Sequence, residues 1–250
     1  MAFHATIYNI WPRIRERACS GHDGMNPTSI QPLAVYPAGE HRLHIDGPAG
    51  PLEAVLSVPD AASPGRVAII CHPNPAMGGT MTNKVVFSLH RACRDQSLMT
   101  LRFNFRGVGA SAGAFDHGAG EQDDLLAVLA WAWRELAARE LVLAGFSFGS
   151  FVAASVWPRA LAGGWRGRSL ILAAPPVTRF PLDGHALPAG TRVIYGDADE
   201  VVDPLAIRDW LAAQPAALEV CVLAGAGHFF HGRLTELKAW VQEGLGVALA

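Results

Sequence analysis

The sequence predicts an α/β protein built on an open, mostly parallel sheet with helices on both faces. Short apolar runs bounded by turn residues recur along the 250-residue chain, and amphipathic helical patterns separate them. Unbroken apolar runs of this length indicate strands that are buried on both faces, as in a parallel sheet. Half of the residues are hydrophobic and 17% are charged, which is typical of a compact enzyme with a large core.

The first 32 residues differ from the rest because their hydrophobic residues follow no sustained helical or strand periodicity. We interpret residues 1–32 as a loosely ordered leader and residues 33–250 as a single folded domain, and one hypothesis is that translation starts at Met25. The N-terminal stretch lacks the apolar core of a secretory signal. The four cysteines are widely spaced, which favours thiols in a reducing compartment. We therefore expect a cytoplasmic protein.

The strands are expected in a regular order. "HRLHIDG" and "LEAVLSVP" alternate in hydrophobicity and flank the turn-rich "GPAGP", so they predict an N-terminal antiparallel hairpin. The buried strands expected after it are "VAIICHP", "LMTLRFNF", "LVLAGFS", "SLILAAPP", "RVIYGD" and "EVCVLAG". The segment 175–190 between two of these strands is too short for a cap domain, so we expect an open site.

Helical patterns lie between the strands. The expected helices are "NKVVFSLHRACRDQ", the segment after "GFSFG", "EQDDLLAVLAWAWREL", "DPLAIRDWLAAQ" and "RLTELKAWVQEGL". Asp203 is a plausible N-cap, with Pro204 at the first helical position. Glu121, Asp123 and Asp124 resemble a catalytic cluster, but we interpret them as a solvated helix start.

One turn carries a chemical signature. "GFSFG" has the pattern G-x-S-x-G, directly follows the strand-like Leu141–Ala144 and directly precedes a helical pattern. A serine on such a strand-to-helix turn is held in a strained backbone conformation, with its hydroxyl projecting over the sheet. The alternative is an ordinary tight turn with an incidental serine. The context favours Ser147 as a nucleophile.

A serine hydroxyl needs a base to react at neutral pH, normally a histidine oriented by a carboxylate. Both residue types follow Ser147, each in a loop after an apolar strand: Asp197, Asp199 and Asp203, then His228 and His231.

These segments together resemble a known family. The stretch "HPNPAMGGTMTNKVV", the loop "RFNFRGVGASAG", the elbow "GFSFG" and the order Ser–Asp–His are similar to small, lidless bacterial members of the α/β-hydrolase superfamily. The resemblance covers roughly residues 40–245. It implies the α/β-hydrolase fold without a cap domain, hydrolysis of esters or related acyl bonds by a serine nucleophile, and no cofactor.

The resemblance also assigns roles to residues. Ser147 matches the nucleophile, and His228, which follows "GAG", matches the catalytic histidine. Asp199 matches the acid of the G-x-x-D pattern in "GDAD". Asp197 remains the competing acid, whereas Asp203 is better explained as a helix cap.

An oxyanion hole requires two N–H donors. The backbone N–H of Phe148 is the first expected donor, and the second should come from the loop after "VAIICHP". Proline lacks an N–H, so Pro73 and Pro75 cannot serve. Asn74 is therefore the expected second donor, with Ala76 as the alternative.

His72 and His231 are further candidates, as substrate contacts. The alternatives are a rigid turn at residues 72–75 and a surface position for His231. We expect no metal site, because the ten histidines include no H-E-x-x-H and no paired Cys–His spacing. The net charge of −2 argues against nucleic-acid or membrane partners. The expected partner is a small-molecule acyl substrate, and the oligomeric state is open.

The sequence thus predicts a serine hydrolase that cleaves carboxylic ester or thioester bonds of small to medium acyl substrates through an acyl-enzyme. An amide or peptide hydrolase would use the same residues, so it remains an alternative. A non-catalytic binding protein with the same fold is a third possibility.

Overall fold

The computed structural model describes residues 36–180, 182 and 187–249. The leader expected at residues 1–32 and the possible start at Met25 lie outside the described residues. In this part of the chain, no helix combines the length and the apolar character needed to cross a membrane.

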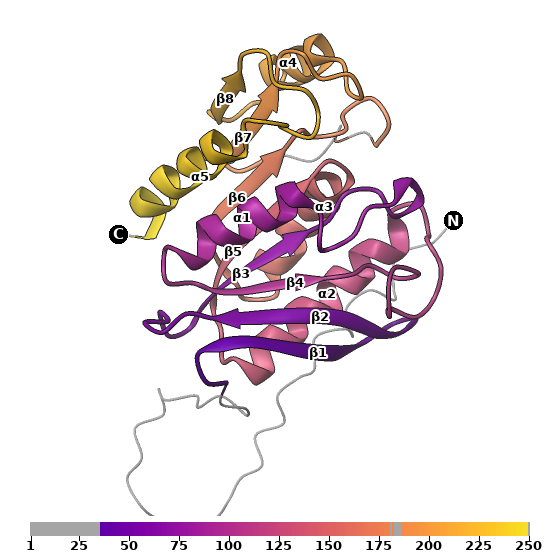
Figure 1. Cartoon of the computed structure of the whole chain (residues 1–250), viewed down its shortest axis with the longest axis vertical. Helices are drawn as coiled ribbons and strands as arrows, with labels where there is room; N and C mark the ends of the chain where they lie inside the picture. The colour runs from indigo at the N-terminus through magenta and orange to yellow at the C-terminus, as the bar shows by residue number, and fades with distance from the viewer. Residues whose placement is uncertain (1–35, 181, 183–186, 250) are drawn as a thin grey trace, which may run out of the picture.

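An eight-stranded sheet forms the centre of the molecule, with the strand order β1-β2-β4-β3-β5-β6-β7-β8 (Figure 1). The strands are β1 (Gly39–Gly47), β2 (Gly50–Val58), β3 (Arg66–Cys71), β4 (Met99–Phe103), β5 (Glu140–Phe146), β6 (Arg166–Ala173), β7 (Arg192–Gly196) and β8 (Glu219–Leu223). β1 and β2 pair antiparallel, and β2 also pairs antiparallel with β4. All other pairings are parallel. The predicted sheet and its N-terminal hairpin are confirmed.

Helices cover both faces of the sheet, as predicted (Figure 1). They are α1 (Lys84–Arg94), α2 (Ala119–Glu135), α3 (Phe148–Ala162), α4 (Pro204–Ala212) and α5 (Leu234–Leu249), with a 3-10 turn η1 (Pro75–Met77). α1 and α5 pack on one face, whereas α2, α3 and α4 pack on the other.

The central strands are buried on both faces because each side packs against a different helix layer. In β3, Ile69 belongs to the core under α2 and α3, and the next residue, Ile70, belongs to the core under α1 and α5. Leu143 and Ala144 of β5 divide in the same way. This two-sided burial explains why the strands are continuous apolar runs and not alternating patterns. Because β3, β5, β7 and β8 run parallel within the sheet, their carboxyl ends lie at one edge of it.

One expectation about α2 is wrong. Glu121 and Asp124 are fully buried and do not form a solvated helix start. The Glu121 carboxylate accepts the N–H groups of Asp116 and Gly118 at 2.8 and 2.7 Å, which caps the helix. Asp124 forms a salt bridge with Arg106 at 2.8 Å and accepts the Arg106 N–H at 3.0 Å. The two acids therefore bind the loop after β4 to the start of α2.

Candidate active site

The turn between β5 and α3 has the geometry expected of a nucleophile elbow. Ser147 has φ 51° and ψ −120°, a region that residues with a side chain rarely adopt. It occupies the N-cap position of α3, yet its side chain forms no capping hydrogen bond. The hydroxyl is therefore available for chemistry, and Ser147 keeps 8% of its surface exposed.

Two glycines make this turn possible. A Cβ on Gly145 would lie 2.2 Å from the carbonyl oxygen of Gly149, and a Cβ on Gly149 would lie 2.3 Å from the carbonyl oxygen of Cys71. Strand and helix can approach this closely only without side chains at both positions. The hydroxyl of Ser150 donates to the carbonyl oxygens of Gly145 and Ala173 at 2.8 and 3.0 Å, which fixes the turn to β6.

The structure brings Asp199 and His228 together. Their side chains are almost fully buried, and Nδ1 of His228 lies 2.8 Å from Oδ2 of Asp199. Since an ionised carboxylate can only accept, Nδ1 carries the proton and Nε2 is left for proton transfer. The His228 ring also packs at 5.1 Å from the ring of Phe146, the residue before Ser147.

Backbone contacts between two loops hold this pair. The N–H of Ala198 donates to the carbonyl oxygen of Ala226 at 3.1 Å. A Cβ on Gly196 would lie 1.9 Å from the same oxygen, so β7 can approach the histidine loop only because residue 196 is glycine. The loops after β7 and β8 therefore run in direct contact where Asp199 and His228 meet.

The other two aspartates have different partners. Asp197 is exposed, and its Oδ1 accepts the N–H of Gly225. Asp203 caps α4 by accepting the N–H of Leu205 at 2.9 Å, as predicted. Asp199 is also anchored by its second oxygen, because Oδ1 accepts the N–H groups of Val201 and Val202, each at 2.8 Å.

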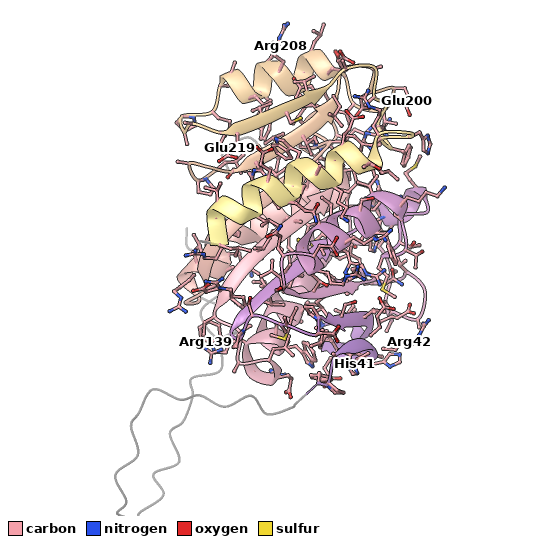
Figure 2. The ribbon with its side chains drawn as sticks, turned by 60° about the vertical axis from the view of Figure 1, so that its left-hand side comes forward. His41, Arg42, Arg139, Glu200, Arg208 and Glu219 are labelled. Atoms are coloured by element: carbon pink, nitrogen blue, oxygen red, sulfur yellow. The ribbon has the colours of Figure 1, made fainter. Side chains whose placement is uncertain are left out.

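Glu200 is a residue that the sequence analysis did not single out. Its carboxylate accepts the backbone N–H of His228 at 3.0 Å, so it holds the histidine loop from the side of β7. Figure 2 shows Glu200 at one end of the molecule and Arg139, which precedes β5, at the other. No sequence signal marks this contact, because 28 positions separate its partners.

Phe148, the first expected oxyanion donor, is the first residue of α3, where N–H groups have no partner within the helix. Its fully buried ring contacts Phe105, Phe115, Phe151 and Phe180, with centroid distances of 4.9 to 6.1 Å. This aromatic cluster fixes the backbone around the N–H.

The loop after β3 carries the second expected donor. Asn74 precedes η1, and its side-chain Oδ1 accepts the N–H of Ala76 at 2.9 Å. The alternative donor, Ala76, is therefore already engaged. The close approach of Gly149 to Cys71 and His72 shows that this loop starts directly beside the nucleophile turn.

His72 does not have the predicted role of a substrate contact. It is fully buried, its Nδ1 lies 2.7 Å from the carbonyl oxygen of Pro73, and its Nε2 accepts the N–H of Phe105 at 3.0 Å. Burial lowers the pKa of His72 to about 4, so the ring is neutral at pH 7. Nε2 ties the loop after β3 to the loop after β4, whereas Nδ1 forms its hydrogen bond within the loop after β3.

His231 lies at the surface beside a pocket of about 290 Å³. The pocket is also lined by residues from the segment 78–85 and by Phe229, whose ring stacks on His231 at 5.9 Å. In the described part of the chain, no group of three or more His, Cys, Asp or Glu side chains could hold a metal ion.

Comparisons with known proteins agree with this architecture, although no protein-family model matches the sequence. The crystal structure of an α/β serine hydrolase without a lid from Xanthomonas campestris is 41% identical, with a TM-score of 0.79 over 85% of this chain and 96% of that chain. An α/β serine hydrolase homologue from Coxiella burnetii is 38% identical, with a TM-score of 0.78 over 84% of this chain and 100% of that chain. An uncharacterized protein of Rickettsia prowazekii is 31% identical over 81% of this chain and 87% of its own length.

The fold, the nucleophile elbow and these relatives together define the chain as a hydrolase of the α/β type. The chain belongs to the α/β-hydrolase superfamily.

Proposed function

We propose that this protein is a serine hydrolase that cleaves carboxylic ester or thioester bonds of small to medium-sized acyl substrates. The observation that carries the proposal is the 2.8 Å contact between Asp199 and His228, at the same edge of the sheet as the strained turn of Ser147. The related structure from Xanthomonas campestris has no lid, which supports an open site here.

In the proposed mechanism, the Ser147 hydroxyl oxygen attacks the acyl carbonyl carbon while Nε2 of His228 takes the hydroxyl proton. Asp199 keeps the imidazole in the required tautomer and stabilises the imidazolium that forms. The N–H groups of Phe148 and Asn74 stabilise the negative charge on the carbonyl oxygen, and losing one such donor typically costs about 3 kcal/mol.

Collapse of the tetrahedral intermediate breaks the bond to the leaving group, which receives the proton from His228. Water then attacks the acyl-enzyme, again losing a proton to His228, and the acid is released as Ser147 regains its proton. The chemistry needs no cofactor. The free thiols of Cys71, Cys93 and Cys221 support our proposal that the protein works in the cytoplasm.

Labelling and turnover test this function together. A fluorophosphonate probe should label the wild-type protein at Ser147, and Ser147→Ala should lose both labelling and hydrolysis of p-nitrophenyl acetate. Ser88→Ala is a matched control, since the Ser88 hydroxyl donates within α1, to the carbonyl oxygen of Lys84. Full turnover by Ser147→Ala would refute the proposal, and an unlabelled wild-type protein would instead favour a binding protein.

A substrate panel separates ester hydrolysis from the amide alternative. Matched acyl groups presented as esters, thioesters and anilides keep the acyl pocket constant and change only the leaving group. We expect turnover of the oxygen or sulfur esters. Faster hydrolysis of the anilides would assign the protein to amide substrates.

A further inference from the structure

The pocket beside His231 has not entered the proposed mechanism, yet it adjoins two parts of it. Phe229 forms one wall, and its ring lies 5.2 Å from the ring of His228 and 5.9 Å from that of Phe146. The lining also includes Gly78, in the loop that carries Asn74. A group in this pocket would therefore lie close to the proposed catalytic histidine.

The described residues that line the pocket include a positively charged side chain and no negatively charged one. Lys84 contributes an ammonium group, and none of the described residues that line the pocket is acidic. Lys84 is exposed and takes part in no ion pair within the described part of the chain. Lys238, the other lysine of the sequence, is bound to Asp95 at 2.6 Å. The positive charge of Lys84 is thus left for a partner from outside the chain.

The neutral groups of the lining add hydrogen-bond donors. The hydroxyls of Thr80 and Thr82 lie 2.8 Å apart, so one donates to the other and the second hydroxyl can donate into the pocket. The Oδ1 of Asn83 accepts the N–H of Val85 at 2.8 Å, which leaves the amide NH₂ of Asn83 as a donor. An ammonium, an amide and a hydroxyl around one cavity suit an anionic oxygen group.

We propose that this pocket binds an anionic group on the substrate, so that the protein prefers esters or thioesters that carry a negative charge away from the reacting carbonyl. Lys84 is the specificity-determining residue, and His231 and Phe229 belong to the same lining. This inference rests on the proposed function, since it concerns the substrate of the same site.

Substrate pairs that differ only in charge test the proposal. Mono-p-nitrophenyl succinate and its methyl ester place the charge on the acyl side, whereas 3-acetoxybenzoate and its methyl ester place it on the leaving group. Wild-type protein should favour the anionic member of at least one pair. Because exposed charge interactions are weak, Lys84→Met should lower kcat/KM for that anion about two- to fivefold. Its neutral partner should change less than twofold.

Three controls make the result specific to charge at this position. Lys84→Arg should retain the preference, Lys238→Met should leave it unchanged, and high salt should weaken it in the wild-type protein. In a Ser147→Ala background, where no turnover is expected, Lys84→Met should weaken binding of the same anion by a similar factor in calorimetry.

The outcomes separate the two proposals. An unchanged ratio of anionic to neutral kcat/KM in Lys84→Met, for both pairs, overturns the anion pocket while Ser147-dependent hydrolysis still stands. Hydrolysis that survives Ser147→Ala overturns the proposed function itself. Lys84 is exposed at the first position of α1, so the variant should fold, and its melting temperature verifies this.

Discussion

Asp199→Asn is the sharpest test of how the site is oriented. The side-chain oxygen Oδ1 accepts two backbone N–H groups, from Val201 and Val202, whereas Oδ2 faces Nδ1 of His228. In the variant, the amide oxygen should stay at the Oδ1 position. In the reverse orientation, the NH₂ group would face two N–H donors and could accept from neither. Each lost hydrogen bond costs about 1 kcal/mol, and leaving buried donors unpaired costs more. The NH₂ group must therefore point at His228.

This orientation changes which nitrogen of the His228 imidazole carries the proton. Facing an NH₂ donor, Nδ1 of His228 becomes an acceptor, so the proton moves to Nε2, and the nitrogen that should accept the Ser147 proton can no longer do so. The same tautomer reversal in a Ser-His-Asp triad lowers kcat by about 10⁴, which corresponds to about 5.4 kcal/mol of transition-state stabilisation. We expect a loss of this order here.

Initial rates of p-nitrophenyl acetate hydrolysis measure the effect, with thermal unfolding to show that the variant folds. Asp203→Asn is the matched control, since Asp203 caps α4 and asparagine is an equally good N-cap, so neither stability nor kcat should change appreciably. Asp197→Asn tests the competing acid and should retain wild-type kcat. The reasoning is refuted if Asp199→Asn keeps kcat within tenfold of the wild-type value while Asp197→Asn loses it.

Two further predictions concern stability. Gly149→Ala places a Cβ 2.3 Å from the Cys71 carbonyl oxygen, so it should destabilise the fold by about 1–3 kcal/mol, or roughly 2–12 °C in Tm. Gly246→Ala is the control, because its Cβ meets nothing within 4 Å and should stabilise α5 slightly; equal melting temperatures for the two variants would contradict the close approach. Burial lowers the pKa of His72 to about 4 in the folded state, below its ordinary 6.5, so the folded state binds fewer protons than the unfolded state between these values. The contribution of His72 to the free energy of unfolding should therefore be at its maximum above pH 6.5. Between pH 6.5 and pH 4 it should fall by about 1.4 kcal/mol for each unit by which the pH is lowered. Urea titrations of the wild type and of His72→Gln should show a shallower acid dependence in the variant, and equal slopes would exclude His72 as the cause.

Much of the fold could be predicted from the sequence because its signals are local. The apolar runs around Ile69 and Leu143 are continuous because each strand is buried on both faces, and this pattern can be recognised directly in the sequence. The elbow at Ser147 is also local, because strand, turn and helix follow one another within about ten residues. The helix cap at Asp203 depends on a contact only two positions away.

Other features depend on contacts between segments that are distant in the sequence. For these features the sequence either left two interpretations open or favoured the wrong one. Whether Asp197 or Asp199 faces His228 depends on how the loops after β7 and β8 lie against each other, and one of their contacts is the close approach of Gly196 to Ala226. Glu121 looked solvated because its own helix start is polar, but the loop after β4 covers it.

The sequence by itself determined the alternation of strands and helices, the hairpin at the start of the sheet and the serine turn. These follow from backbone preference and hydrophobic period, which act over a few residues. Only the tertiary structure decided which carboxylate orients His228, that both nitrogens of His72 are engaged, and that Lys84 faces a pocket beside Phe229. Those outcomes are set by burial and by hydrogen bonds across tens of residues, which no local pattern encodes.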